Sequence, residues 1–227
     1  MLNQIKKMLI EDGYTVNEPI ENLLEIEGYL KDEELEFFLN LAKGATEEEW
    51  SHQYMESLKP FCLEKFGRDD VDNLVAEGLF EITQNWADKN LEIKDSNMTS
   101  VITQRLNKYF KQIDSNIVNG GLGSIQRMYN KTELKAHTDQ DTDPSIRYAT
   151  IIYLNDDYVD GEVFWTHKNF KIRPKPGTML VFPGTEEFHH GVGFVGDGPV
   201  RYVIVGFVRD INFYEFDREG NRRSDRY

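Results

Sequence analysis

Residues 147–155 read RYATIIYLN, a run of β-branched, aliphatic and aromatic residues that leads into the turn residues 155–157 (NDD). Runs of the same kind lie on both sides of it, separated by glycine, proline, asparagine or aspartate residues. These further runs are Ser124–Tyr129, Glu162–His167, Phe170–Ile172, Thr178–Phe182 and Val200–Val208. Many short strands divided by such turns are typical of a sandwich or barrel. The second half of the chain is therefore predicted to be a β-structure of one of these kinds.

The first half of the chain reads mostly helical, and Gly120–Gly123 (GGLG) marks the change of pattern. Asn22–Leu30 (NLLEIEGYL) predicts one short strand ahead of the helices. A helix is expected to open at Lys31–Glu34 (KDEE), with Asp32 as its N-cap. Acidic residues in a first turn also interact favourably with the helix dipole.

Three further segments of this half carry helical signals. Thr46, followed by Glu47–Glu49, repeats the pattern of a capping residue with acids after it. The apolar spacing predicts helices over Val71–Ala87 and Ser100–Ile113. We interpret the acidic runs as solvated helix faces, because apolar residues are interleaved with them.

Composition narrows the class of protein. The 227 residues include 39% hydrophobic residues, as in an ordinary globular chain, and only one cysteine, Cys62, so no intramolecular disulfide can form. A net charge of -14 repels nucleic acid and anionic membranes at long range. No apolar run approaches the roughly 20 residues that span a bilayer. We expect a cytoplasmic protein with neither a nucleic-acid partner nor a membrane partner.

Two short stretches of the β-rich half carry metal-binding residue types. Residues 136–139 (AHTD) place His137 and Asp139 two apart, and such side chains point to the same side of an extended segment. Residues 188–192 (FHHGV) add His189 and His190. Two histidines and one carboxylate on one face of a metal leave the opposite positions open, as in the facial triad of non-haem iron(II) oxygenases.

Arg201 stands at the start of another apolar run, residues 201–205 (RYVIV). A guanidinium that faces into a barrel requires an anionic partner. A dicarboxylate would supply one, because the planar guanidinium can bind a carboxylate through two hydrogen bonds. The competing interpretation is an arginine at a strand edge that pairs with a local acid such as Asp197.

The region from about Gln126 to Arg209 resembles the catalytic core of the 2-oxoglutarate/iron(II)-dependent dioxygenases, on the prolyl 4-hydroxylase branch. The matching segments follow the family's order: Arg127–Tyr129 (RMY), His137–Asp139 (HTD), Arg147–Asn155 (RYATIIYLN), Asp160–Phe164 (DGEVF), Lys175–Phe182 (KPGTMLVF), His190–Val192 (HGV) and Arg201–Tyr202 (RY). Leu24–Leu30 and the helix after it resemble the family's N-terminal strand and helix. Residues 45–115 match poorly, and we interpret them as a variable helical insertion.

This resemblance implies an α+β fold with a mainly β core, a double-stranded β-helix or jelly-roll, with the N-terminal and inserted helices packed on one sheet. It also implies a single domain over residues 1–227. Within it, residues 1–118 would be mainly helical with one leading strand. Residues 119–212 would form the jelly-roll catalytic core, and residues 213–227 a charged tail.

The resemblance also implies roles for individual residues. The iron ligands and the co-substrate arginine form the catalytic set: His137, Asp139, His190 and Arg201. Arg201 would pair with the far carboxylate of 2-oxoglutarate, and Tyr153 resembles a tyrosine that hydrogen-bonds the same carboxylate. Tyr129 resembles a tyrosine near the other end of the co-substrate; an ordinary core tyrosine is the competing interpretation. His190 is favoured over its neighbour His189, because the family pattern reads His, any residue, Val.

The implied reaction is hydroxylation of a C–H bond, coupled to decarboxylation of 2-oxoglutarate to succinate and CO2. Fe(II), 2-oxoglutarate and O2 are the implied cofactor and co-substrates, and ascorbate is an added candidate reductant. A protein or peptide that contains proline is the favoured substrate and partner. The candidate substrate-pocket residues are Arg147, Trp165 and Phe207.

Two alternatives stay open at this point. One is a hydroxylase of a free amino acid or another small molecule, and the other is a non-catalytic, metal-binding, cupin-like module. Nucleic-acid demethylases of the superfamily are disfavoured. They carry a second arginine six residues after the co-substrate arginine, whereas position 207 here is Phe and the next arginine is Arg209.

Overall fold

The computed structural model describes residues 1–52, 62–70, 73–74, 77–79 and 89–214. Its strands are β1 (Thr15–Ile20), β2 (Leu23–Glu27), β3 (Trp50–His52), β4 (Lys89–Glu92), β5 (Ile117–Met128), β6 (Leu134–His137), β7 (Ile146–Tyr153), β8 (Val163–Trp165), β9 (Phe170–Ile172), β10 (Met179–Pro183), β11 (His190–Val192) and β12 (Arg201–Asp210). Its helices are α1 (Leu2–Glu11), α2 (Asp32–Gly44), α5 (Ser96–Ile113) and α6 (Asp139–Thr142). Short 3-10 helices are η1 (Glu47–Glu49), η3 (Glu186–Phe188) and η4 (Ile211–Tyr214).

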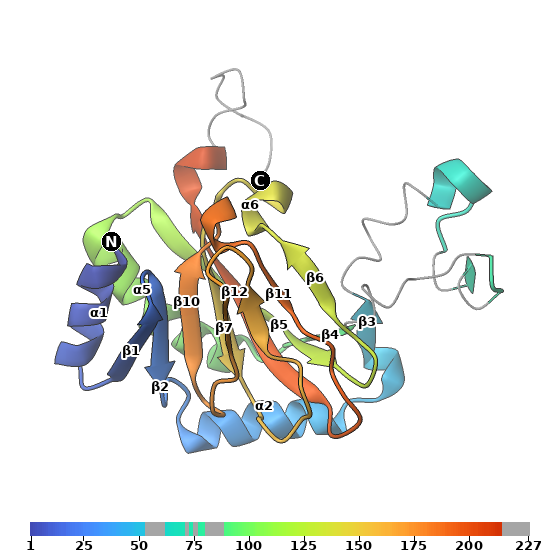
Figure 1. Cartoon of the computed structure of the whole chain (residues 1–227), viewed down its shortest axis with the longest axis horizontal. Helices are drawn as coiled ribbons and strands as arrows, with labels where there is room; N and C mark the ends of the chain where they lie inside the picture. The colour runs from blue at the N-terminus through green and yellow to red at the C-terminus, as the bar shows by residue number, and fades with distance from the viewer. Residues whose placement is uncertain (53–61, 71–72, 75–76, 80–88, 215–227) are drawn as a thin grey trace.

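The strands form two antiparallel sheets that face each other (Figure 1). The larger sheet has the order β1-β2-β10-β7-β12-β5-β4-β3, and the smaller has the order β6-β11-β8-β9. Strands that neighbour each other in space come from distant parts of the chain, as in β7 beside both β10 and β12. This is the expected jelly-roll, with a mixed helix and sheet architecture around it.

The two faces of the larger sheet have different partners. Ile152 of β7 and Ile204 of β12 belong to a core that also holds buried residues of α1, α2 and α5. Ile151 of β7 points the other way, into a second core with Val163 of the smaller sheet. Successive strand residues face opposite sides, which is why adjacent isoleucines serve different cores. The helices therefore cover one face of the larger sheet, as predicted, and the other face is left to form the sandwich.

The N-terminal part contributes more strands than predicted. Asn22–Leu30 contains β2, as expected, but β1 precedes it and pairs with it. Strands β3 and β4 lie inside the region expected to be helical and extend the larger sheet beside β5. Gly120–Gly123 falls within β5 and does not end a segment. A strand ladder is formed by backbone groups, so glycines can occupy it without side-chain packing.

At the starts of α2 and η1, a glutamate side chain accepts the backbone N–H of the N-cap residue. The N-cap of α2 is Lys31, not Asp32, because the Glu34 carboxylate accepts the Lys31 N–H at 2.8 Å. Thr46 is the N-cap of η1, and Glu49 accepts its N–H at 2.8 Å. Helix α5 covers the predicted helix Ser100–Ile113. The predicted helix over residues 71–87 and the charged tail lie largely outside the described residues. Among the helices of the described ranges, none combines the length and the apolar character that crossing a bilayer requires.

Candidate active site

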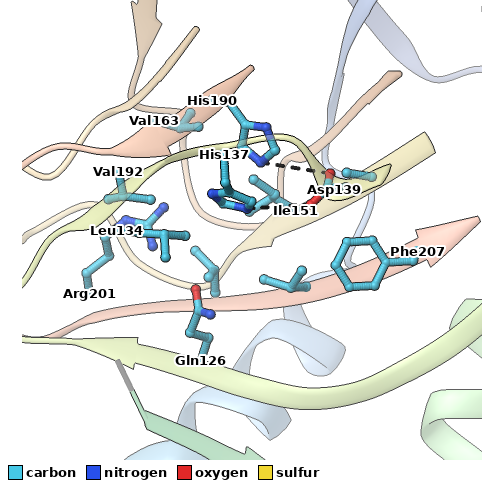
Figure 2. Close-up of a pocket in the computed structure, with 13 residues that line it drawn as sticks. Gln126, Leu134, His137, Asp139, Ile151, Val163, His190, Val192, Arg201 and Phe207 are labelled. Carbon is cyan, nitrogen blue, oxygen red and sulfur yellow. Dashed lines mark ion pairs between the residues drawn. The ribbon is translucent and has the colours of Figure 1, made fainter. Parts of the chain in front are cut away.

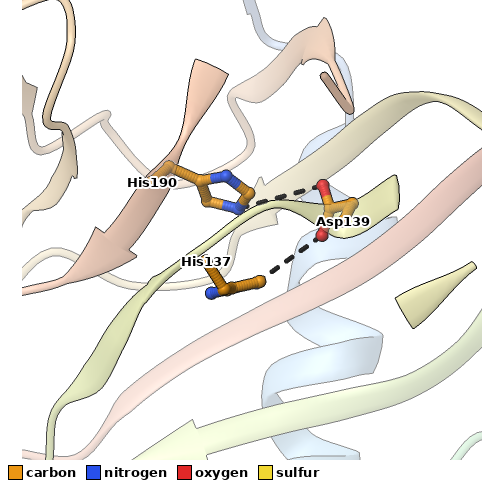
Figure 3. Close-up of side chains that lie close together, drawn as sticks. All are labelled: His137, Asp139 and His190. Carbon is orange, nitrogen blue, oxygen red and sulfur yellow. Dashed lines mark ion pairs between the residues drawn. The ribbon is translucent and has the colours of Figure 1, made fainter. Parts of the chain in front are cut away.

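Three side chains from two neighbouring strands and one short helix meet at the mouth of the sandwich (Figure 3). His137 is the last residue of β6, and His190 is the first residue of β11. These two residues pair directly across the two strands. Thr138 has extended backbone, and Asp139 then begins α6, so His137 and Asp139 point to the same side as predicted.

The ligand atoms of these three residues are close enough to hold one ion. They lie within 4.8 Å of one another. His137 Nε2 is 3.6 Å from Asp139 Oδ1, and His190 Nε2 is 3.9 Å from Asp139 Oδ2. Such distances leave room for an ion between the atoms. Asp139 and His190 are buried, whereas the His137 side chain is 34% exposed and marks the open side.

Backbone carbonyls fix the orientation of both imidazole rings. His137 Nδ1 lies 2.9 Å from the Lys135 carbonyl oxygen, and His190 Nδ1 lies 3.0 Å from that of Phe188. A carbonyl only accepts, so each Nδ1 carries the hydrogen and each Nε2 presents its lone pair toward Asp139. Metal-binding histidines commonly use their second nitrogen in this way.

The protonation states suit a cation. Burial lowers the pKa of His190 to about 4, although the Asp139 carboxylate acts in the opposite direction. His190 is therefore a neutral ligand at neutral pH. Asp139 Oδ2 is buried and has no hydrogen-bond partner among the described residues. A buried carboxylate oxygen without a partner is costly, and a metal ion would remove that cost. The set of two imidazoles and one carboxylate fits iron(II).

Arg201 lies deeper in the same sandwich and is 1% exposed. Its guanidinium donates a 3.3 Å hydrogen bond to the Tyr153 hydroxyl and lies 3.7 Å from the Met128 sulfur. In the described part of the chain it forms no ion pair, and its Nε has no hydrogen-bond partner. Asp197, the local acid considered above, instead accepts a hydrogen bond from Asn130. A buried cation of this kind calls for an anionic ligand.

One pocket joins the triad to Arg201 (Figure 2). Its empty volume is about 490 Å³, including the open mouth. The polar residues of its wall are His137, Asp139, His190, Arg201 and Gln126. The other lining residues are apolar: Leu134, Ala149, Ile151, Val163, Val192, Val203, Val205 and Phe207. The pocket thus has the Arg201 guanidinium at one end and the triad at the other, with apolar side chains lining the walls between them.

Three residues predicted for this pocket do not line it. Tyr129 follows the end of β5, and its ring lies 5.8 Å from the Arg127 guanidinium. Arg147 is 45% exposed and pairs with Asp210 at 2.7 Å. Trp165 is 1% exposed and packs edge-on against Phe182 in the core. Of the three predicted substrate residues, only Phe207 lines the pocket.

Gln126 and Met128 are the residues that the sequence left unassigned. Gln126 is 4% exposed and lines the pocket, and Met128 contacts Arg201. Alternation along β5 turns both toward the pocket and so takes Met128, rather than Tyr129, to Arg201. A polar residue at an inward position of a strand was the signal for Gln126. His189 points away from the triad, and its Nδ1 lies 2.8 Å from the Thr166 hydroxyl.

Comparison with known families agrees with this site. Residues 123–209 match the family model of the 2OG-Fe(II) oxygenase superfamily. Prolyl 3-hydroxylase 2 from Homo sapiens is 34% identical over 76 residues, which are 31% of this chain and 11% of that protein. The Rattus norvegicus protein matches to the same extent. The match thus spans about a tenth of the length of these relatives.

Solved structures agree with the fold. A prolyl hydroxylase from Trichoplax adhaerens, in complex with a hypoxia inducible factor oxygen degradation domain peptide fragment, superposes with a TM-score of 0.59. It is 16% identical, and the match covers 92% of this chain and 89% of that one. The viral collagen prolyl hydroxylase of Paramecium Bursaria Chlorella virus-1 gives a TM-score of 0.55 at 14% identity, covering 83% and 96%. The resemblance to 2-oxoglutarate/Fe(II) oxygenases, with prolyl hydroxylases as structural neighbours, is therefore confirmed.

Proposed function

We propose that this chain is an Fe(II)- and 2-oxoglutarate-dependent dioxygenase that hydroxylates proline residues in a protein or peptide. One observation carries the proposal: a facial His, Asp, His set and a buried arginine without a carboxylate partner in the described residues share one apolar pocket. Neither feature by itself would specify an oxygenase. Together they match the needs of a metal ion and a dicarboxylate bound side by side.

His137, Asp139 and His190 would hold the iron. When bound there, iron(II) would supply the redox chemistry that couples decarboxylation of 2-oxoglutarate to succinate and CO2 with oxygen transfer from O2 to a C–H bond. The three residues occupy one face and leave the opposite positions for co-substrate and O2. The role of the protein is to fix this geometry before the substrates arrive.

Arg201 and Tyr153 would hold the far carboxylate of 2-oxoglutarate. The guanidinium offers donors in a planar fork, and its buried position strengthens the pairing. Burial raises the pKa of Tyr153, so its hydroxyl stays protonated and can donate to the carboxylate. The valine and leucine walls exclude water along the aliphatic part of the co-substrate.

A prolyl substrate is supported by the surroundings of the triad and by the comparisons. Phe207 lines the pocket, and an aromatic face packs well against a pyrrolidine ring. Several of the similar proteins are named prolyl hydroxylases, and one of these was solved with a peptide bound. Ascorbate as a reductant and a cytoplasmic location complete the proposal; leaving out ascorbate should lower total turnover, and a tagged chain should fractionate with the cytosol.

The test has two stages. Iron(II) and 2-oxoglutarate are first added without air, and the visible metal-to-ligand charge-transfer band is expected in the wild type and absent in His137→Ala. O2 is then admitted with a panel of proline-containing peptides, including (Pro-Pro-Gly)10, and with free L-proline. Succinate formation together with one added oxygen on a peptide supports the proposal. Oxidation of free L-proline alone would overturn the peptide substrate, and no succinate under any condition would overturn the enzyme.

A further inference from the structure

Strand β12 presents a row of side chains to the pocket. Arg201, Val203, Val205 and Phe207 all line it, while Ile204 and Val208 face the helices. Arg209 is the next residue in this alternating series; it does not line the pocket itself, and we call its position beside Phe207 the rim. The register between β12 and β7 shifts at Arg209: Val208 lies opposite Tyr148, but Arg209 lies opposite Ile146, so one residue of β7 is skipped. Irregular pairing beside an active site commonly redirects a side chain.

Among the described residues, Arg209 contacts Phe207 and Asp143 at this rim. Its guanidinium lies over the Phe207 ring at 5.2 Å from the centroid. Its Nε donates to Asp143 Oδ2 at 2.9 Å. The Arg209 side chain is 29% exposed and that of Asp143 is 25% exposed, so both are half-buried. The guanidinium is therefore fixed between the ring and the carboxylate.

Asp143 is itself held in place. Its Oδ1 accepts from the Ser145 N–H at 3.0 Å and from the Ser145 hydroxyl at 2.6 Å. Its own N–H donates to the carbonyl of Asp139 at 3.0 Å, at the end of α6. Asp139, which starts α6, is one of the three triad residues. A short chain of contacts therefore joins the triad to the Phe207 ring through Asp143 and Arg209.

We propose that Arg209, anchored by Asp143, is a positioning residue that fixes the Phe207 ring and so sets the substrate C–H bond relative to the triad. This inference rests on the proposed function. A guanidinium stacked on an aromatic ring restricts the orientation of that ring. If the ring is the wall against which the substrate packs, a loose ring holds the substrate loosely. Arg201 and the triad do not contact Arg209, so co-substrate binding is independent of it.

The first experiment measures the coupling of the two half-reactions. Arg209→Met and Asp143→Asn are compared with the wild type, using (Pro-Pro-Gly)10 and any peptide that the panel identifies. The ratio of succinate to hydroxylated product should rise about tenfold, while the KM for 2-oxoglutarate and the affinity for iron(II) stay within about twofold. Arg209→Lys keeps the charge but not the planar stack and should be intermediate.

Arg105→Lys is the matched control. Arg105 also lies over an aromatic ring, that of Tyr29, and pairs with a carboxylate, that of Glu34, but on the helical face of the larger sheet. Its substitution should lower thermal stability and leave the ratio unchanged. A ratio of succinate to hydroxylated product that stays at the wild-type value in the Arg209 variants would overturn this inference and leave the proposed function standing. Loss of iron affinity in those variants would also overturn it, because Arg209 would then act through Asp139. No succinate from the wild type would overturn the proposed function instead.

A second experiment needs no turnover. The chain is labelled with 4-fluorophenylalanine, and the Phe207 resonance is assigned by its loss in Phe207→Leu. In Arg209→Met and Asp143→Asn this resonance should broaden or split, because the ring samples further orientations. In Arg105→Lys it should keep its line width. An unchanged line width in both rim variants would show that Arg209 does not fix the ring.

Discussion

His189 and His190 are adjacent in the chain, yet the structure gives them different surroundings. His190 begins β11 and faces His137 across the pair of strands. His189 precedes the strand, and its ring lies near that of His167 at the surface. The reason is local: η3 ends at Phe188, and its carbonyl accepts the His190 Nδ1–H. The His190 Nε2 therefore lies near Asp139, whereas the His189 ring lies beside Thr166 and His167, away from the triad.

Substitution of each histidine should separate the two positions. His190→Ala removes a neutral, buried ligand, and we expect it to weaken iron(II) binding by at least about 100-fold. His189→Ala removes a partly exposed ring that contacts Thr166, and we expect affinity within about threefold of the wild type. Anaerobic titration calorimetry with iron(II) measures both. The opposite ranking would show that the distal ligand is His189.

Arg201 offers a prediction for the co-substrate. Arg201→Met keeps much of the side-chain volume but removes the buried charge, and we expect the KM for 2-oxoglutarate to rise about 100-fold. Tyr153→Phe removes a single hydroxyl, and the expected rise is about tenfold. Initial rates of succinate formation at varied 2-oxoglutarate give both values. Equal KM values in all three proteins would show that the buried cation serves only the fold.

The residue scale also shows which roles a sequence can reveal. His137 and Asp139 were identifiable because one extended residue separates them, and an extended backbone has a fixed period. Tyr129 does not line the pocket, because β5 ends one residue earlier at Met128 and it is Met128 that contacts Arg201. Arg147 does not line the pocket either and pairs instead with Asp210, which is far along the chain. The alternation of side chains along a strand can be read from neighbouring residues. The end of a strand and an ion pair with a distant residue depend on the rest of the fold.

At the scale of elements, the close approach of β6 and β11 depends on Gly191. A Cβ at this position would lie 2.5 Å from the Leu134 carbonyl oxygen and 2.9 Å from the Ala136 nitrogen. Both are backbone atoms of β6, so the strands themselves would have to separate. These strands carry His137 and His190. The glycine is therefore needed for the spacing of two ligands.

Gly191→Ala should therefore damage the metal site as well as the fold. We expect a loss of about 1–3 kcal/mol in the free energy of unfolding and at least tenfold weaker iron(II) binding. Gly193→Ala is the matched control, because a Cβ there would meet its nearest atom, the Glu162 carbonyl oxygen, at an ordinary 3.6 Å. Denaturant unfolding and metal titration compare the two. Equal behaviour would show that β6 moves without cost.

The contact between α2 and α5 predicts a dependence on pH. Burial opposes ionisation of Glu34, but hydrogen bonds from Arg105 and the Lys31 N–H hold the pKa of its carboxyl below the usual range. Because the pKa is lower in the folded state, this stabilisation is present above the unfolded pKa of about 4.3 and is lost as pH falls through the folded value. Glu34→Gln should lower the free energy of unfolding by about 1–3 kcal/mol at pH 7.

The variant should also show a flatter decline in stability from pH 5 to pH 3 than the wild type. Urea unfolding at several pH values measures both effects. A parallel decline in the two proteins would show that other carboxylates dominate acid unfolding. The helix start at Lys31 could not be predicted from side-chain type, because Glu34 accepts a backbone N–H, which every residue except proline supplies.

At the scale of the whole molecule, the sheets explain what the sequence could and could not predict. A sandwich or barrel follows from local features, since short strands alternate with turns, whereas the jelly-roll was implied only by the family resemblance. The placement of β3 and β4 at the edge of the larger sheet does not follow from local features, because it depends on pairing with β5. Local propensity underestimates strands of three or four residues that gain their stability from a neighbour. Residues along β7 and β12 alternate between two cores. One core lies on the helical face of the larger sheet, and the other lies on the pocket face.

Binding at the pocket should stabilise the entire fold, because its walls come from both sheets. Ligands that bind only the folded state add about 2.7 kcal/mol at 100 times their dissociation constant. For a chain of this size, that raises the melting temperature by about 5–10 °C. We expect iron(II) alone, without air, to give part of this rise and 2-oxoglutarate to add the rest. His137→Ala should lose both increments, whereas Arg201→Met should keep the first and lose the second. Calorimetry under nitrogen makes the comparison, and a 2-oxoglutarate increment that survives in Arg201→Met would place the co-substrate away from the buried arginine.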